Sequence, residues 1–343
     1  MSQITETPPL LAEGKTKVLT QHPAEPTQVY VRFKDRATAF NAAKTADVPG
    51  KGAMNAAMTA HLFAYLAQQG IASCYVGPGR TPDELVYQKL TMIPLEVVVR
   101  NVAYGSLCQR YSQFQSGQPL SRPVVEFFLK TDSDPLIAED VAHALGILPS
   151  GVDFAKLRRQ ALVLNDLLVP FFQSLGIVCA DFKLEFGVSP SGALLLADEL
   201  SPDNFRLRDA NTGDILDKDV FRLDQGDLAQ TYQRLLDRLK ASPSSSATRE
   251  GTLKQCYEAQ LVVRYRQSVL HPESRAILES LHSLGYANVQ SLQAGKHFQL
   301  TIESEDRLQA TRQVEALAEA ILSNPVIEDF ECVCIEPVEK ERL

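Results

Sequence analysis

Apolar and charged residues alternate strictly along the segment 179–187, which reads CADFKLEFG. Asp181, Lys183 and Glu185 stand between apolar residues at 180, 182, 184 and 186. This period of two predicts a strand with one face in a core and the other face carrying acid, base and acid. The question for function is whether solvent or a charged ligand covers that second face.

The same pattern predicts that this strand continues into a hairpin over 186–199, where two apolar runs are joined by a Ser-Pro-Ser-Gly turn. With a four-residue loop, Val188 faces Ala193 and Lys183 faces Asp198. The charged residues of the first strand and Asp198 would then converge on one surface. A slip of one residue in this register would move Asp198 to the other face of the sheet.

Other segments before residue 241 mix helices and strands. Apolar residues at helical spacing predict helices at 56–70, 154–176 and 226–241, and the run LEVVVR predicts a strand at 95–100. Because helices and strands do not alternate regularly, an α+β fold is expected rather than a doubly wound sheet.

The stretch KASPSSSATREGT at 240–252 is small and polar, which is typical of a linker. After it, alternating and helical patterns predict strands at 259–266, 288–293, 297–303 and 327–335 and helices at 272–284 and 305–322. This β-α-β-β-α-β order is that of a ferredoxin-like unit. We therefore predict three parts of the chain, namely a first domain at 1–241, a linker at 242–255 and a ferredoxin-like domain at 256–343.

Composition and charge narrow the class of protein. The 343 residues carry a formal net charge of −8, which argues against a nucleic-acid-binding surface. No run of residues reaches membrane-spanning length, and the first residues lack the pattern of a secretory signal. The six cysteines show no metal-ligand spacing, so reduced thiols in a cytoplasmic protein are expected.

The charged strand and the acidic pair after it suggest a cation site. Glu185 and Asp198 would repel each other unless a cation lay between them, and Mg²⁺ bound through carboxylates and substrate phosphates suits this arrangement. The alternative is a solvated strand face with a Lys–Glu ion pair.

The segment 97–111, VVVRNVAYGSLCQRY, suggests an anion site. A strand ends at Arg100, and Ser106 begins a helix in which Ser106 and Gln109 fit a capping box. A helix N-terminus beside an arginine is suited to phosphate. Asp203, Arg206 and Arg208 follow the second hairpin strand in a predicted loop, where the arginines either bind a carboxylate or phosphate or are ordinary surface charges.

The segment 12–19, AEGKTKVL, places Lys15 and Lys17 on one face of a predicted strand just after Gly14. They are either lysines that protect a sheet edge or cations that bind nucleotide phosphates. The chain has no Walker A run and no G-x-G-x-x-G, so a nucleotide site would belong to neither the P-loop nor the Rossmann type.

With these stretches in view, the chain to about residue 241 resembles the phosphoribosylaminoimidazole-succinocarboxamide synthases, ligases of purine biosynthesis. The matching motifs are EGKTK at 13–17, MIPLEVVVRNVAYGS at 92–106, FFLKTD at 127–132, DFKLEFG at 181–187 and DELSPDNFRLRD at 198–209. Two departures concern the pocket. Tyr104 stands where the family usually has a small residue, and Asn41 where it often has an acid.

The resemblance implies a two-lobed ATP-binding domain similar to kinases and ATP-grasp enzymes. Its substrates would be ATP, L-aspartate and carboxyaminoimidazole ribonucleotide, with Mg²⁺, in a homo-oligomer. The expected site residues are Asp181, Lys183 and Glu185 for catalysis, Gly14, Lys15, Lys17 and Lys130 for ATP, Arg100, Ser106, Asp203 and Arg206 for the other substrates, and Glu185 and Asp198 for the metal.

Residues 257–337 resemble the small subunit of phosphoribosylformylglycinamidine synthase through SVLHPES, LGYANVQSLQAGKHFQLTIE and NPVIEDFE. The family's usual Asp-Pro is His271-Pro272 here. This resemblance implies a module that contacts subunits of that synthase. Two other functions fit the residues less well, a Mg–ATP-dependent small-molecule kinase with an alcohol acceptor and a scaffold without catalysis.

Overall fold

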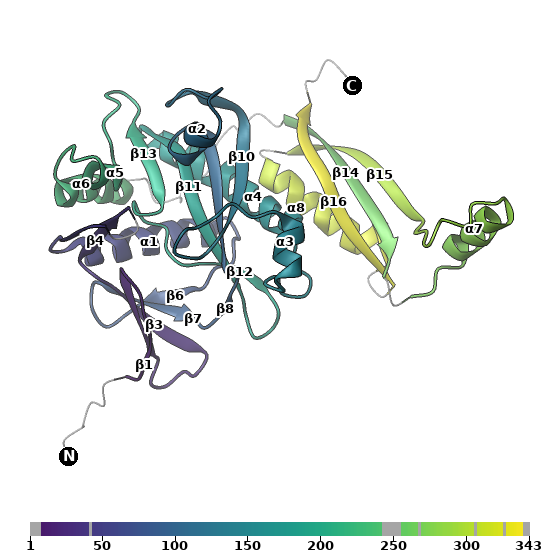
Figure 1. Cartoon of the computed structure of the whole chain (residues 1–343), viewed down its shortest axis with the longest axis horizontal. Coiled ribbons are helices and arrows are strands. Elements are labelled where there is room, and N and C mark those ends of the chain that lie inside the picture. The colour runs from purple at the N-terminus through teal and green to yellow at the C-terminus, as the bar shows by residue number, and fades with distance from the viewer. Residues whose placement is uncertain are drawn as a thin grey trace. The chain divides into compact units, whose positions relative to one another are not determined.

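The computed structural model describes residues 8–40, 43–241, 255–266, 269–304, 307–324 and 327–338. The chain divides into two compact units, Met1–Ser244 and Ser245–Leu343, which Figure 1 shows coloured from purple to yellow along the sequence. Of the predicted linker 242–255, Gln255 already begins a strand and the other residues lie outside those described. The exact domain boundaries therefore stay predictions.

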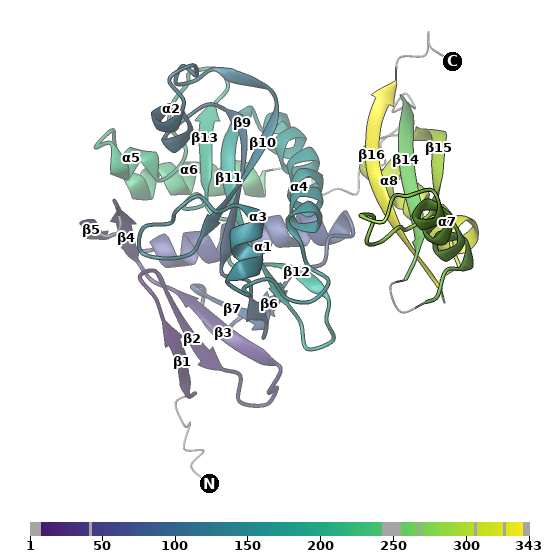
Figure 2. The same cartoon turned by 45° about the vertical axis from the view of Figure 1, so that its right-hand side comes forward.

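The first sheet of the N-terminal unit is antiparallel and five-stranded, in the order β1-β2-β3-β7-β6. Its strands are β1 (Leu10–Glu13), β2 (Lys17–Gln21), β3 (Gln28–Phe33), β6 (Tyr75–Pro78) and β7 (Glu84–Gln88). Helix α1 (Lys51–Gln68) packs on β3, β6 and β7 and, on another side, on α6 (Leu228–Lys240). Figure 2 shows α1 crossing between this sheet and the second one. A hairpin of β4 (Arg36–Ala39) and β5 (Lys44–Asp47) lies apart from both sheets.

The second sheet has six strands, ordered β10-β9-β11-β12, with β13 and β8 also paired to β11. They are β8 (Thr91–Met92), β9 (Leu95–Val102), β10 (Pro119–Leu129), β11 (Ile177–Val188), β12 (Leu194–Ala197) and β13 (Phe205–Asp209). The long helix α4 (Phe154–Ser174) packs against β9, β10 and β11. Short helices α2 (Ser106–Arg110), α3 (Glu139–Ala144) and α5 (Asp219–Arg222) complete the unit.

Strand β11 is the period-two strand predicted from the sequence, and its apolar residues Phe182, Leu184 and Phe186 are each 1% exposed. The α+β class and the helices at 56–70, 154–176 and 226–241 are confirmed, although α1 begins five residues earlier than predicted, at Lys51. Among the described residues no helix combines the length and apolar character that a bilayer crossing requires. All six cysteines are free thiols.

The predicted register of the hairpin is wrong by one residue. Val188 pairs with Leu194 rather than Ala193, and Glu185 pairs with Ala197. The loop is tighter than expected because Ser189 and Ala193 hydrogen-bond through their backbones at 2.9 Å, and the Ser189 hydroxyl also accepts the Ala193 N–H at 3.1 Å. Gly192, with φ 87°, supplies the left-handed residue that this three-residue turn needs.

The C-terminal unit contains a three-stranded antiparallel sheet, ordered β15-β14-β16. Its elements are β14 (Gln255–Tyr265), α7 (Pro272–Ser283), β15 (Gly295–Ser304), α8 (Arg307–Leu317) continued by the π-helical turn Ala318–Leu322, and β16 (Glu328–Val338). The predicted strand at 288–293 is wrong, since these residues form no regular structure. Val289 is tied back to the end of α7 instead, because its carbonyl oxygen lies 2.8 Å from His282 Nε2.

Candidate functional site

Three lysines and four carboxylates meet where the two sheets of the N-terminal unit approach each other. We call this group the lysine–carboxylate cluster, and it consists of Lys17, Glu96, Lys130, Lys183, Glu185, Asp198 and Glu199. Lys17 comes from β2 in the first sheet, and the other members come from β9, β11 and the ends of β10 and β12 in the second. The cluster therefore depends on both sheets.

Lys183 is the centre of the cluster. Its ammonium nitrogen lies 2.8 Å from Glu96, 2.8 Å from Glu185 and 3.9 Å from Asp198. Burial alone would lower the pKa of Lys183, but the carboxylates of Glu185, Asp198 and Glu96 outweigh it and hold that pKa well above its usual value. Lys183 is therefore a permanent cation at any physiological pH.

Lys17 joins the first sheet to the same carboxylates. It forms an ion pair with Asp198, and its ammonium lies 2.8 Å from Glu199. Burial lowers the pKa of Lys17, yet the two carboxylates raise it by more. Burial likewise raises the pKa of Asp198, but Lys17 and Lys183 pull it below the ordinary value. The charges of this pair persist because each partner stabilises the other.

Asp198 reaches the cluster despite the corrected register. It lies just after β12 and has a left-handed backbone with φ 62°, a conformation that Asp tolerates better than most residues. This turn directs its carboxylate toward Lys17 and Lys183, and Asn204 donates to it at 3.3 Å. The prediction that Lys183, Glu185 and Asp198 come together is confirmed geometrically, by a route that the sequence did not indicate.

Two other predicted nucleotide-binding residues lie outside the cluster. Gly14 is in the β1–β2 turn, where its N–H donates to the Lys17 carbonyl at 2.9 Å. Lys15 follows it in that turn and is exposed, so the prediction that it lies in a strand is wrong. The turn reverses the chain after Glu13, before β2 begins at Lys17. Lys130 does belong to the cluster, through its ion pair with Glu185.

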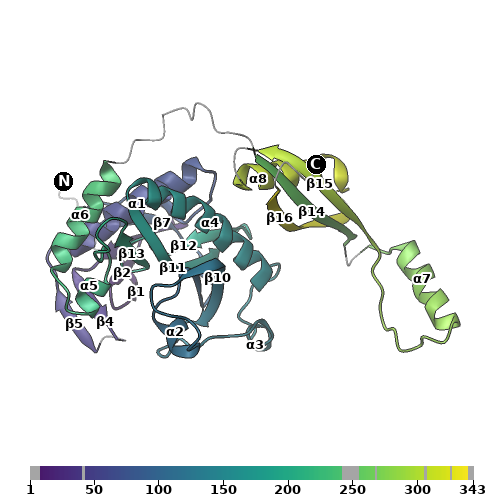
Figure 3. The same cartoon turned by 90° about the horizontal axis from the view of Figure 1, so that it is seen from above.

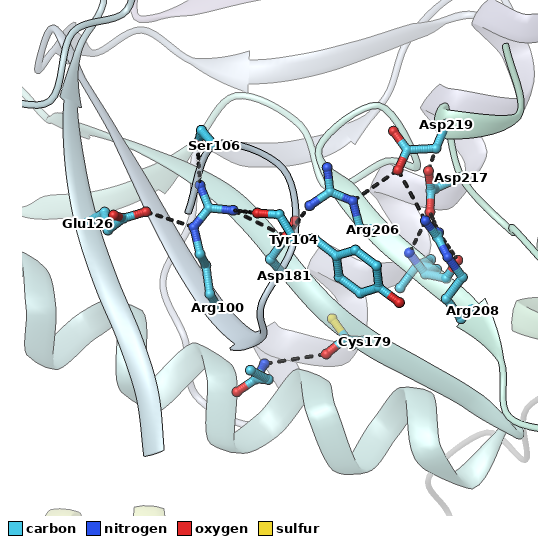
Figure 4. Close-up of polar contacts among 12 residues, drawn as sticks. Arg100, Tyr104, Ser106, Glu126, Cys179, Asp181, Arg206, Arg208, Asp217 and Asp219 are labelled. Atoms are coloured by element: carbon cyan, nitrogen blue, oxygen red, sulfur yellow. Dashed lines mark hydrogen bonds and ion pairs between the residues drawn. The ribbon is translucent and has the colours of Figure 1, made fainter. Parts of the chain in front are cut away.

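A second group lies nearer the start of β11 and is drawn in Figure 4. We call it the arginine–aspartate cluster, and it consists of Arg100, Ser106, Asp181, Arg206, Arg208, Asp217 and Asp219. Asp181 forms its centre and pairs with two arginines, Arg100 at 3.3 Å and Arg206. Burial raises the pKa of Asp181, and the two arginines offset this rise only in part. Asp181 makes these contacts instead of joining Lys183 and Glu185, so the predicted convergence of all four charged residues is wrong at Asp181.

The predicted anion-binding residues Arg100, Ser106 and Arg206 do lie together. Arg100 donates to the Ser106 hydroxyl at 3.0 Å and to Glu126 at 2.7 Å. The capping box is wrong, because the N-cap of α2 is Gly105 and the Ser106 hydroxyl is bound by Arg100. Gly105, with φ 54°, also leaves room for Arg206, whose guanidinium would lie 3.3 Å from an added Cβ.

Arg206 and Arg208 lie on strand β13 rather than in a loop, so the predicted loop is wrong. β13 pairs with β11, and this pairing brings both arginines beside the Tyr104 ring, at 5.3 Å and 5.4 Å from its centroid. Two aspartates from the segment after β13 also hold these arginines. Asp219 lies 2.9 Å from Arg206 and 3.1 Å from Arg208, and Asp217 forms an ion pair with Arg208. Figure 4 shows the Tyr104 ring next to Arg206 and Arg208.

Asp203 belongs to neither cluster. Its carboxylate pairs with the buried Lys51 at 2.6 Å and accepts hydrogen bonds from Tyr232 at 2.5 Å and Asn55 at 3.2 Å. This arrangement ties the segment after β12 to α1 and α6. The structure thus places Asp203 apart from Arg100, Ser106 and Arg206, with which it was grouped.

Sequence reasoning missed several charged residues of these clusters. Glu96 and Glu126 are acids beside the apolar runs of β9 and β10, and Lys51 follows Gly50 at the start of a helix. The acids were a usable signal, because a charged residue on a buried strand needs a partner.

Of the residues described, no three His, Cys, Asp or Glu side chains gather as a metal site. Asn41, whose identity departs from the resembling family, lies outside the described residues.

Comparisons with known proteins extend the resemblance to most of the chain. Residues 10–239 match the family model of SAICAR synthetase, and residues 258–336 match the PurS model, described as phosphoribosylformylglycinamidine (FGAM) synthase. A phosphoribosylaminoimidazole-succinocarboxamide synthase of Halalkalibacterium halodurans is 44% identical over 67% of this chain and 97% of its own. The corresponding enzyme of Deinococcus radiodurans is 46% identical over 66% of this chain and 95% of its own.

A solved structure gives the same result for the fold. A SAICAR synthetase in complex with ADP superposes with a TM-score of 0.63 and 41% identity, covering 67% of this chain and 97% of its own. The matched part is similar in size to the N-terminal unit.

Proposed function

Because the chain belongs to the SAICAR synthetase family, we propose that it joins L-aspartate to the carboxylate of carboxyaminoimidazole ribonucleotide at the expense of ATP. The products are SAICAR, ADP and phosphate. The observation that carries this proposal is the lysine–carboxylate cluster, in which permanent cations from both sheets surround one group of carboxylates. Such cations stabilise the negative charge that develops when a phosphoryl group is transferred.

We assign ATP to Lys17, which comes from the first sheet, and to Lys130, which comes from the second, because both ammonium groups lie in this cluster. Lys17 is held between Asp198 and Glu199, and Lys130 is half exposed beside Glu185. An ATP phosphate that approached would find both ammonium groups within one cluster. The SAICAR synthetase solved in complex with ADP supports a nucleotide as a substrate of this chain.

The donor set fits Mg²⁺ as well. Glu185 and Asp198 both lie within 4 Å of the Lys183 ammonium, so the space between them already accommodates one positive charge. Carboxylate oxygens are the ligands Mg²⁺ prefers, and with two of them the ion would keep waters or phosphate oxygens as its other ligands. Glu185 and Asp198 would hold the ion, which when bound neutralises charge on the transferring phosphoryl group.

Lys183 has a separate task in the proposed reaction. Its ammonium orients the carboxylate that ATP activates and neutralises the charge that this carboxylate and its acyl phosphate carry. Glu96 and Glu185 fix Lys183 in position for this task by accepting two of its three N–H donors. The amine of aspartate then attacks the acyl carbon and phosphate leaves.

We assign the 5′-phosphate of the ribonucleotide to the arginine–aspartate cluster. Arg100 and Arg206 are oriented there by Asp181, and Ser106 lies next to Arg100 at the start of α2. Guanidinium groups bind phosphate through two parallel hydrogen bonds. In this arrangement Asp181 is a positioning residue for two arginines, a narrower role than the catalytic one predicted from the sequence.

An assay of ADP release, with each substrate omitted in turn, tests the reaction. Strict dependence on L-aspartate and on the ribonucleotide supports the ligase. ADP release that persists without aspartate would support a kinase with an alcohol acceptor and contradict the proposal.

For the C-terminal unit, the match to the FGAM synthase model supports docking to subunits of that synthase. Sedimentation of the full chain mixed with the purified large subunit tests this partner. A boundary that moves faster than either protein alone supports docking, and two unchanged boundaries would contradict it.

A further inference from the structure

Helix α1 carries a buried side-chain amide that lies between two carboxylates. Asn55 is 2% exposed, and its Nδ2 donates to Asp203 at 3.2 Å and lies 3.5 Å from Oε2 of Glu199. An amide nitrogen has two N–H donors, so this one can serve both acids at once. Asn55 therefore joins an acid of the lysine–carboxylate cluster to Asp203, which lies outside that cluster.

The oxygen of the same amide has no partner. Asn55 Oδ1 is buried and accepts no hydrogen bond from any described residue. Turning the amide over would place this oxygen, rather than the donors, against the two carboxylates. A buried oxygen without a partner lowers stability, and an apolar side chain of similar size would not carry that penalty. The presence of Asn at this position therefore needs an explanation other than folding.

Glu199 connects Asn55 to the proposed reaction. One oxygen of Glu199 lies 2.8 Å from the Lys17 ammonium, and the other accepts the Ser201 hydroxyl and faces Asn55. Lys17 also pairs with Asp198, but Asp198 is shared with the central lysine of the cluster. Within the described part of the chain, Glu199 forms its ion pair with Lys17 alone. The direction of the Lys17 side chain thus depends on how Glu199 is held.

The other end of this bridge is a buried ion pair. Asp203 lies 2.6 Å from the Lys51 ammonium, and these two side chains are 5% and 1% exposed. Asp203 also accepts the Tyr232 hydroxyl at 2.5 Å. Lys51 belongs to α1 and Tyr232 to α6, two helices that pack side by side (Figure 3). Asn55 is therefore held at Asp203 by both helices while its second N–H faces Glu199.

We propose that Asn55 is a positioning residue for ATP, which fixes Glu199 so that the Lys17 ammonium is ready for the phosphates. This inference rests on the assignment of ATP to Lys17. A free lysine side chain has many rotamers, and ordering it in advance reduces the entropy that is lost when the nucleotide binds. The unpaired Oδ1 follows from this role, since both N–H donors of the amide must point at acids.

Titration with a fluorescent ADP analogue, mant-ADP, in the presence of Mg²⁺ tests the role of Asn55. Asn55→Ala removes both donors, and we expect it to weaken binding of the analogue about tenfold. The KM for the ribonucleotide should not change. Thr59→Val is the matched control, because the Thr59 hydroxyl, one turn along α1, is also buried without a partner among the described residues. This control should keep the wild-type affinity and raise the melting temperature.

A second pair of variants separates the two ends of the bridge. Ser201→Ala removes a donor to Glu199, and Tyr232→Phe removes a donor to Asp203. If Asn55 acts through Glu199, Ser201→Ala should weaken mant-ADP binding, whereas Tyr232→Phe should lower the melting temperature and keep the affinity. This pair decides the question even if Asn55→Ala does not fold.

Three results would overturn the inference. The first is wild-type affinity for mant-ADP in Asn55→Ala, and the second is an equal loss of affinity in Ser201→Ala and Tyr232→Phe. The third is an equal rise of the mant-ADP dissociation constant and the ribonucleotide KM in Asn55→Ala, which would indicate a general structural role. A wild-type chain that did not bind mant-ADP would overturn the assignment of ATP itself, and this inference with it.

Discussion

At the scale of single residues, Asp198 shows how a correct prediction of which side chains meet can follow from an incorrect register. The period-two pattern identified Lys183 and Glu185 as neighbours of an acid from the next strand. The pairing is shifted by one residue, and the left-handed φ of Asp198 restores the contact. No pattern of apolar and polar residues reports a single backbone dihedral, so this feature could not be predicted from the sequence.

Asp198→Asn tests the cluster, because Asn tolerates the same backbone conformation and removes only the charge. We expect kcat to fall roughly 100-fold or more while the melting temperature changes little. Asp224→Asn is the matched control, since Asp224 also has a positive φ, 56°, and pairs with a lysine, Lys44, away from the cluster. If steady-state kinetics showed that Asp198→Asn keeps full activity, Asp198 would not be a ligand of the metal.

Tyr104 is a residue whose role the sequence left open. Its ring lies beside Arg206 and Arg208, and cations near an aromatic face are attracted to it. Tyr104→Ala should therefore raise the KM for the ribonucleotide about tenfold and leave the KM for ATP nearly unchanged. Tyr104→Phe keeps the ring and should behave like the wild type. If both KM values rose equally in the alanine variant, Tyr104 would have a general structural role.

Asp217 should make stability depend on pH. Burial, with a further contribution from Asp219, raises the pKa of Asp217 to about 6 in the folded protein, against 3.8 when unperturbed. The folded state therefore keeps a proton that the unfolded state has lost between these values. This stabilisation is complete below pH 3.8 and disappears as the pH rises through about 6.

The free energy of unfolding should thus fall by up to about 3 kcal/mol between pH 4 and 7 through this group. Urea unfolding of the wild type and of Asp217→Asn measures the effect, which the substitution should remove. Asp214→Asn, at an exposed site in the same segment, should keep the wild-type slope. An Asp217 carboxyl that titrated near 4 by NMR would contradict the argument.

At the scale of elements, period and turn chemistry predicted the three long helices of the N-terminal unit and its strands β9, β11 and β12, together with the helices and strands of the C-terminal unit. Apart from the hairpin register, which the local turn determines, two failures share a cause, because each depends on contacts from elsewhere in the chain. Arg206 and Arg208 become a strand by pairing with β11, and the loop at 288–293 is fixed by contacts to α7 and β14. Local sequence patterns carry no information on such partners.

The hairpin loop offers a test at this scale. Gly192 has φ 87° and no atom within 4 Å of an added Cβ, so Gly192→Ala would add backbone strain without a clash. We expect it to lower the free energy of unfolding by about 1 kcal/mol. Gly77→Ala is the control, since that glycine has equal space and no positive φ. Denaturant unfolding measures both variants. If both lost the same free energy of unfolding, the positive φ of Gly192 would not be what stabilises the turn.

At the scale of the whole molecule, the two units carry separate tasks. Both clusters are built entirely from residues of the N-terminal unit. A chain that ends at Ala241 should therefore keep most of its ligase activity in the ADP-release assay. Loss of activity in a truncated chain that remained folded by circular dichroism would show that the units are functionally coupled.

The ion pairs of Lys17 bear on which anions the enzyme admits. Because Asp198 and Glu199 already neutralise this lysine, a phosphate can reach it only by displacing a carboxylate or by arriving with a cation that takes the carboxylate over. Sulfate, inorganic phosphate and magnesium-free ATP bring no such cation. The cluster is thus expected to act as a filter that favours the metal–nucleotide complex over the free anions abundant in a cell.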